Sequence, residues 1–90
     1  NANFGYEFDA DANTVVITHE GGEPIEVDRL SVVRSESGTI PSGSTGWSGT
    51  VHAGDATHKL PYAAGEHIRV VWASEEGDRS KTLANHQAPS

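Results

Sequence analysis

Five histidines are the side chains of this 90-residue chain best suited to bind a metal or transfer a proton: His19, His52, His58, His67 and His86. None of them forms the His-x-x-x-His pair with which a helix places two ligands on one side. His52 and His58 flank a turn and could meet across a hairpin, so metal binding by a histidine pair stays open as an alternative. Otherwise the spacing predicts exposed or singly hydrogen-bonded histidines, and we assign no catalytic residue, metal ligand or cofactor.

Serines and carboxylates are common, but they lack the sequence context that catalysis requires. There is no Gly-x-Ser-x-Gly elbow that would present a nucleophile at a strand-to-helix turn. The segment 9–13 (Asp-Ala-Asp-Ala-Asn) has the oxygen alternation that opens a calcium loop, but it is not followed by the glycine of that loop. We therefore predict a turn with solvated carboxylates there, a charged hairpin tip at 75–78, and a protein that is not an enzyme.

Trp47 and Trp72 are the remaining candidates for a binding surface, because an exposed indole can stack on a sugar. Trp72 ends an alternating face that begins with Ile68 and Val70. Such a face of a strand is buried in most proteins. Trp47 resumes the chain after a polar stretch and can anchor it to the core. We predict that both side chains belong to the core.

The charge of the chain excludes some classes of partner. Thirteen Asp and Glu stand against six Lys and Arg, for a formal net charge of -7. Nucleic acid is not expected to bind, since phosphate neutralisation needs a basic face. An acidic composition with only two lysines favours a salt-rich, halophilic environment, where counterions screen self-repulsion. The absence of cysteine excludes disulfides and thiolate chemistry.

The elements that must position these side chains read as short strands. Phe4, Tyr6 and Phe8 alternate with polar residues, which predicts a strand with one buried face. A second strand is predicted from Val15 to Thr18 or His19, and Pro24 breaks the chain after it. Further extended segments are predicted at 25–27, 30–34, 47–51, 56–60, 66–73 and 79–83.

Turn signals recur about every eight to twelve residues, and no window has a sustained helical period. The pattern predicts a single domain over 1–90, a small all-β, immunoglobulin-like antiparallel β-sandwich of about seven strands. The polar stretch 35–46 is predicted to be a long surface loop, and 84–90 a frayed tail. The expected core consists of Phe4, Tyr6, Phe8, Val15, Ile17, Leu30, Val32, Ile68, Val70 and Trp72.

Three segments resemble, in this order, the soluble portion of haloarchaeal type IV pilins. They are 16–23 (VITHEGGE), 47–55 (WSGTVHAGD) and 68–83 (IRVVWASEEGDRSKTL), and the resemblance runs from about Phe4 to Leu83. It implies the outward-facing head domain of a secreted pilin, whose hydrophobic N-terminal helix would precede Asn1 and assemble with other pilin subunits into the filament core. It also implies an extracellular, cell-surface filament that supports adhesion to surfaces or other cells.

The sequence leaves one competing class open. The domain could instead be a carbohydrate- or metal-binding module of a larger secreted surface protein. Because the chain begins at Asn1 and contains no Met, we expect residue 1 to be a processing or trimming point. Without a filament-forming helix, the 90-residue chain is expected to be monomeric.

The acidic composition predicts a dependence of stability on salt. If the acidic surface is an adaptation to salt, raising the ionic strength from dilute buffer to molar salt will screen carboxylate repulsion and raise the melting temperature. Thermal unfolding followed by circular dichroism measures this, with the same series in an uncharged osmolyte as the control. A melting temperature that stays flat or falls with salt contradicts the halophilic interpretation.

Overall fold

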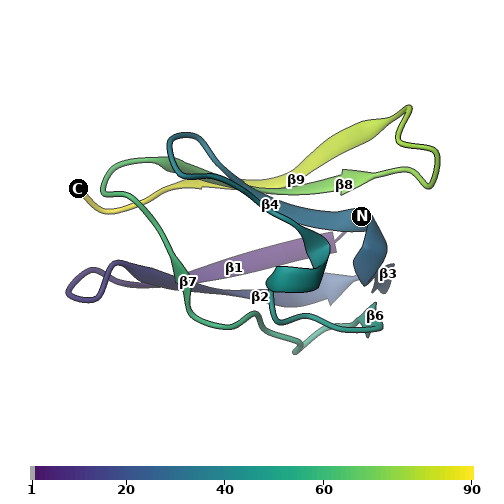
Figure 1. The fold of residues 1–90 in the computed structure, drawn as a ribbon. Coiled ribbons are helices and arrows are strands. Elements are labelled where there is room, and N and C mark those ends of the chain that lie inside the picture. Colours follow the sequence, from purple (N-terminus) through teal and green to yellow (C-terminus); the bar gives the residue numbers. More distant parts are fainter. Residues whose placement is uncertain (1) are drawn as a thin grey trace.

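The computed structural model describes residues 2–90, and Asn1, the expected processing or trimming point, lies outside them. The described chain forms two antiparallel layers packed face to face (Figure 1). One layer has the strand order β1-β2-β7, formed by Ala2–Asp9, Thr14–Gly22 and Leu60–Pro61. The other has the order β5-β4-β8-β9, formed by Gly38–Ile40, Leu30–Arg34, His67–Ala73 and Ser80–Gln87. A short pair, β3 (Ile25–Glu26) with β6 (Thr50–Val51), extends one end.

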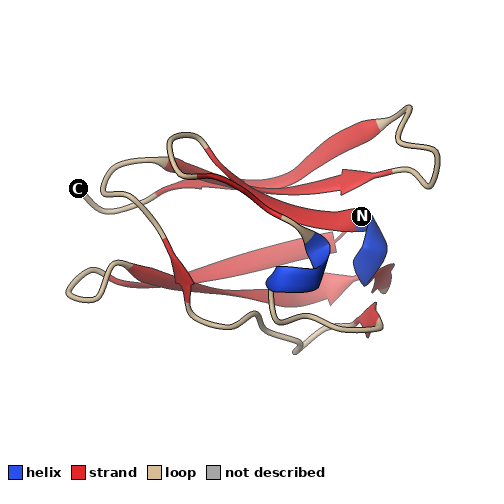
Figure 2. Ribbon diagram, viewed as in Figure 1, coloured by secondary structure: helices blue, strands red, loops and turns tan. Residues whose placement is uncertain are grey.

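The strand order is that of an immunoglobulin-like sandwich. A sheet of strands A, B and E faces a sheet of strands C′, C, F and G when β1, β2 and β7 are matched to the first and β5, β4, β8 and β9 to the second. The predicted all-β fold is confirmed. Residues 2–90 contain nine strands rather than about seven. Three of the nine, β3, β6 and β7, are only two residues long. The helical structure of this part of the chain is limited to two 3-10 turns, η1 (Val27–Arg29) and η2 (Ser42–Ser44) (Figure 2).

The first hairpin follows from its sequence. Period-two alternation puts Phe4 on the inner face of β1 opposite His19 of β2, with a bulge between Asn3 and Phe4. The turn closes because the Asp9 carboxylate accepts hydrogen bonds from the backbone N–H groups of Asp11 and Ala12, both at 3.2 Å. Asn13 completes it with φ 54°, a left-handed conformation that Asn tolerates.

The opposite layer is held in register by its central strand β8. Val32 of β4 lies opposite Val70, and Leu30 lies opposite Trp72. Ile68 and Val70 are fully buried, as their alternation predicts. A bulge between Val70 and Val71 shifts the pairing with β9 by one residue.

The prediction of a frayed tail from residue 84 is wrong as far as Pro89, whose carbonyl oxygen accepts from the N–H of Gly65 at 2.9 Å. Strand β9 runs to Gln87, and Ala88 is buried, with its N–H donating to the carbonyl oxygen of Glu66 at 2.7 Å. The strand is held partly by an aromatic contact, since the His86 ring lies 4.5 Å from the Tyr6 ring between centroids. These anchors are small or polar residues, which carry little hydrophobic signal in the sequence.

The prediction of a long surface loop at 35–46 is also wrong beyond the turn 35–37. Strand β5 and η2 occupy most of the remainder, and Ile40 and Thr45 are buried. Thr45 can be buried because its hydroxyl is satisfied: it donates to the carbonyl oxygen of Ser42 and accepts from the N–H of Trp47, each at 3.2 Å. A polar composition is therefore compatible with packing here.

The segment before β7 follows β2 without forming the regular strand predicted at 56–60. Thr57 donates its N–H to the carbonyl oxygen of Ile17 at 2.9 Å. Its hydroxyl accepts from the N–H of Ile17 at 3.0 Å. The side chain thus takes the place of a backbone partner, and regular pairing resumes only at Leu60 and Pro61.

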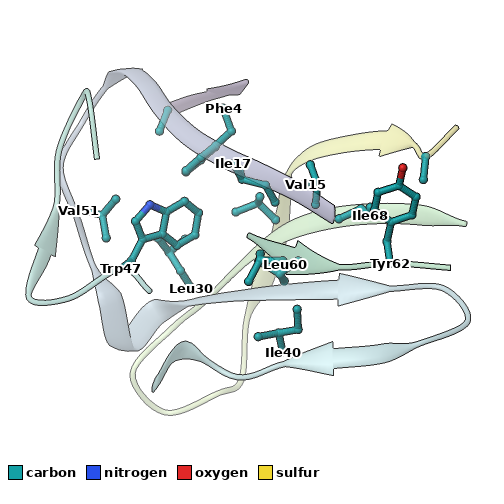
Figure 3. Close-up of a cluster of buried hydrophobic side chains, with 14 residues drawn as sticks. Phe4, Val15, Ile17, Leu30, Ile40, Trp47, Val51, Leu60, Tyr62 and Ile68 are labelled. Carbon is teal, nitrogen blue, oxygen red and sulfur yellow. The ribbon is translucent and has the colours of Figure 1, made fainter. Parts of the chain in front are cut away.

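The core lies between the layers and contains most of the predicted residues. Phe4, Val15, Ile17, Leu30, Val32, Ile68 and Val70 are buried as expected, whereas Tyr6, Phe8 and Trp72 are partly buried and pack against this cluster. Trp47 is 5% exposed and lies among Phe4, Leu30 and Val51 (Figure 3). Its indole N–H donates to the carbonyl oxygen of Asp55 at 3.1 Å. The prediction for Trp47 is confirmed, and Trp72 belongs to the core only in part.

Two tyrosines provide a matched test of this packing. Tyr6 Oη donates to the carbonyl oxygen of Ile68 at 2.9 Å and so links the layers, whereas Tyr62 Oη is buried with no hydrogen-bond partner among residues 2–90. We expect Tyr6→Phe to lower the free energy of unfolding by about 1 kcal/mol, because a buried carbonyl loses its donor. Tyr62→Phe should leave it unchanged or raise it by up to about 1 kcal/mol, because an unpaired buried hydroxyl disappears. Urea unfolding at neutral pH measures both, and equal losses would contradict the difference in hydrogen bonding.

Candidate functional site

A groove of ≈ 570 Å³ opens at the end of the sandwich where β3, η1 and the β8–β9 turn meet. Its apolar lining comes from Ala2, Pro24, Ile25, Trp72 and Leu83. We call this the end groove. Its size is within the range of small-molecule sites in proteins.

The end groove exists because the two layers stop at different points. The inward face of β8 continues through Ile68 and Val70 to Trp72, the next residue on the same side of the strand. The first two are fully buried, but Trp72 is only half-buried. Strand β2 of the opposite layer ends at Gly22, and the chain turns through Pro24. The indole therefore lies at the open end of the core.

The rim of the end groove carries charges of both signs. The Arg79 guanidinium lies 5.9 Å from the centre of the Trp72 ring, within cation–π distance. Arg29 Nη2 lies 3.9 Å from Glu75 Oε2, a long ion pair with a largely exposed carboxylate that contributes little to stability. In all, the lining contains three basic side chains, Arg29, Arg79 and Lys81, and four acidic ones, Glu23, Glu26, Glu75 and Glu76. The formal sum, 3 − 4, is −1.

A buried carboxylate closes the opposite end of the sandwich. Glu66 is 1% exposed and precedes β8. Its Oε1 accepts from the N–H groups of Glu36 and Ser37, both at 2.8 Å. Its Oε2 accepts from the Ser37 hydroxyl at 2.7 Å and from the N–H of Ala63. We call this arrangement the Glu66 clamp; it joins the β4–β5 turn to the turn that leads into β8.

The Glu66 clamp determines the protonation state of the carboxyl group. Burial alone raises the pKa of Glu66, but the hydrogen bonds donated by Ala63, Ser37 and Glu36 stabilise the charged form more strongly and lower the pKa to about 2. Glu66 is thus ionised across the physiological range. All of its donors belong to the domain itself, so we assign it a structural role.

The histidines lie in different environments. His19 is fully buried, and its Nε2 bonds the carbonyl oxygen of Glu23 at 2.9 Å, so Nε2 carries the proton. Its Nδ1 has no partner among the described residues. His52 is exposed, and its Nδ1 lies 3.8 Å from Asp55 Oδ2 in the turn that Asp55 closes. Across residues 2–90, no group of three or more potential ligands is placed to hold a metal ion.

The acidic loops are solvated turns, as predicted. Asp9 and Asp11 are exposed, and the tip at 75–78 is a turn between β8 and β9. Glu20 stands where a calcium loop would supply its last ligand, twelve residues counted from Asp9. Strand β2 carries it away from the turn, to a position beside Gly5 of β1.

Two features were missed from the sequence alone: the Glu66 clamp and the end groove. The clamp did leave a signal, since Glu66, Ile68 and Val70 share one alternating face, and an inward-facing carboxylate must find donors. The groove left none, because it depends on where β2 stops relative to β8.

The chain matches no protein-family profile and no curated protein sequence. Residues 2–90 also contain no helix long and apolar enough to cross a membrane.

The Glu66 clamp yields a prediction about pH. Glu66→Gln replaces one accepting oxygen by an amide N–H₂ that faces the donors of the clamp, and these donors then lose their acceptor. We therefore expect the free energy of unfolding at pH 7 to fall by about 2 to 4 kcal/mol. The folded-state pKa is lowered, so the carboxylate contributes fully above its unfolded pKa of about 4.5 and loses this contribution as the pH falls toward about 2. The difference between wild type and variant should therefore shrink over that interval.

Urea unfolding at a series of pH values measures the effect, and Glu36→Gln, an exposed neighbour, is the matched control. A difference that is constant from neutral to acidic pH would show that the Glu66 charge does not stabilise the fold.

Proposed function

We propose that this domain is the outward-facing head of a subunit of a type IV pilus-like surface filament, with a structural and adhesive role and without catalysis. The observation that carries the proposal is the ordered resemblance of three segments to haloarchaeal pilins. The acidic composition agrees with an origin in high salt.

The three segments that resemble pilins lie in the strands and connections of the sandwich. The first coincides with β2, and the third spans the β8–β9 hairpin, including its turn. The second contains Trp47 and returns to β2, where the N–H of His19 donates to the carbonyl oxygen of Asp55 at 2.9 Å. The resemblance thus concerns the residues that build the sandwich, not one exposed loop.

The arrangement of the two ends supports a particular orientation. Strand β1 begins beside the end groove, whereas the turn 10–13, the turn 35–37 and the C-terminus lie at the other end (Figure 1). A filament-forming helix that preceded β1 would attach at the groove end. The opposite end, with the Glu66 clamp, would then face outward and present the two turns to surfaces or other cells.

The experiment locates the native protein. Antibodies raised against the 90-residue domain should decorate surface filaments by immunogold electron microscopy on cells that carry the intact gene. The same antibodies should detect the protein in the sheared filament fraction, while the purified domain elutes as a monomer in size-exclusion chromatography with light scattering.

A strain in which the gene is deleted provides the control for antibody specificity. A cytosolic pool with no filament-associated protein would reject the proposal. Filaments that persist unlabelled in wild-type cells would reject it equally.

A further inference from the structure

We propose that the end groove binds a neutral pyranose ring, stacked on Trp72, as the terminal unit of a glycan. This goes beyond the filament proposal and is tested on the isolated domain, because the filament proposal turns the groove end toward the filament. It assigns a ligand to the one tryptophan that the core does not enclose.

The core encloses the two tryptophans to different degrees. Trp47 is enclosed and its N–H is bonded to Asp55. Trp72 is half-buried at the open end of the core, in a groove of ≈ 570 Å³ with Ile25 and Leu83. Pyranose rings have an apolar C–H face that packs on an indole, so a half-buried tryptophan in a hollow is a suitable platform.

The rim of the end groove carries both acidic and basic side chains. An anionic ligand would meet four carboxylates, and a cationic ligand would meet Arg29, Arg79 and Lys81. A hydroxyl both donates and accepts hydrogen bonds, so a neutral polyhydroxylated ring can use guanidinium donors and carboxylate acceptors together. The mixed rim therefore favours a neutral sugar over a uronic acid or an amino sugar.

The Trp72 ring is held in place by its strand. Trp72 lies in β8, paired on one side with Leu30 of β4 and on the other with Lys81 of β9. The Arg79 guanidinium, 5.9 Å from the ring centre, belongs to an exposed side chain, so a stacking sugar can displace it. A ring held in a central strand loses little conformational freedom on binding, which lowers the entropic cost of a weak interaction.

The test uses the ¹⁵N-labelled 90-residue chain and a matched set of probes. Methyl glucoside, methyl galactoside and methyl mannoside are titrated to millimolar concentrations, beside the glucuronide and the glucosaminide, which differ from the glucoside in charge. At least one neutral glycoside should shift the Trp72 indole N–H and the amide signals of Arg29 and Glu75 saturably. The two charged probes should bind about threefold to tenfold more weakly than the glucoside.

Variants identify the platform. Trp72→Ala should weaken the affinity about tenfold or more, and Trp72→Phe, which keeps an apolar ring and protects the fold, about threefold. Trp47→Phe is the matched control and should leave the affinity unchanged. Retained affinity in Trp72→Phe and Trp72→Ala would overturn the assignment.

Three other outcomes also overturn it. One is that none of the neutral glycosides shifts the Trp72 indole. Another is that the glucuronide binds more tightly than the glucoside, which would show that the site prefers anionic ligands. The third is that a short Thr-Val peptide shifts the β9 amides and the indole while the sugars do not, which would assign the groove to strand pairing with a peptide. Each is read from the purified domain, so a failure here is distinct from a failure to find the protein in filaments.

Discussion

The fold depends on one buried charge. A 90-residue sandwich without cysteine has no disulfide between its layers, and its core is thin. Glu66 compensates at one end by accepting hydrogen bonds from two separate turns, while its own backbone carbonyl accepts from Ala88. One residue thereby fixes the β4–β5 turn, the entry to β8 and the end of the chain. A buried carboxylate is costly to desolvate, and only a full set of donors makes it favourable.

The edge of the small core reaches both ends of the sandwich, where the layers stop. The two ends protect this edge from solvent to different degrees. At the Glu66 end, hydrogen bonds draw the turns together and exclude solvent. At the other end, the layers differ in length, Trp72 remains half-buried, and charged side chains surround it. The first end is specialised for stability, and the second leaves an accessible apolar surface.

The sequence predicted the parts of the fold that rest on large apolar residues in alternation. Phe4, Ile17, Val32 and Val70 indicated β1, β2, β4 and β8 correctly, and turn residues such as Asp9 and Gly77 indicated where the chain reverses. The sequence failed where polar side chains replace backbone or apolar partners, as Thr45, Thr57 and His86 do. Thr45 bonds to its neighbours Ser42 and Trp47, but its polar side chain gives no signal of burial. The interactions of Thr57 and His86 join residues distant in the sequence, so no local pattern records them. The end groove was unpredictable for the same reason, although Trp72 had been recognised as a candidate.

The hydrogen bond from Tyr6 to Ile68 has a consequence for how the chain acquires its structure. It joins residues 62 positions apart, and β4 must wait for β8 before it gains its central partner. Local hairpins such as β1–β2 can form early, but the two layers cannot close until almost the whole chain is present. Topologies of this kind fold slowly, because distant segments must meet before burial rewards them. A nascent chain would therefore stay open until its last strand emerged, and a truncation within β9 would remove the final step of assembly.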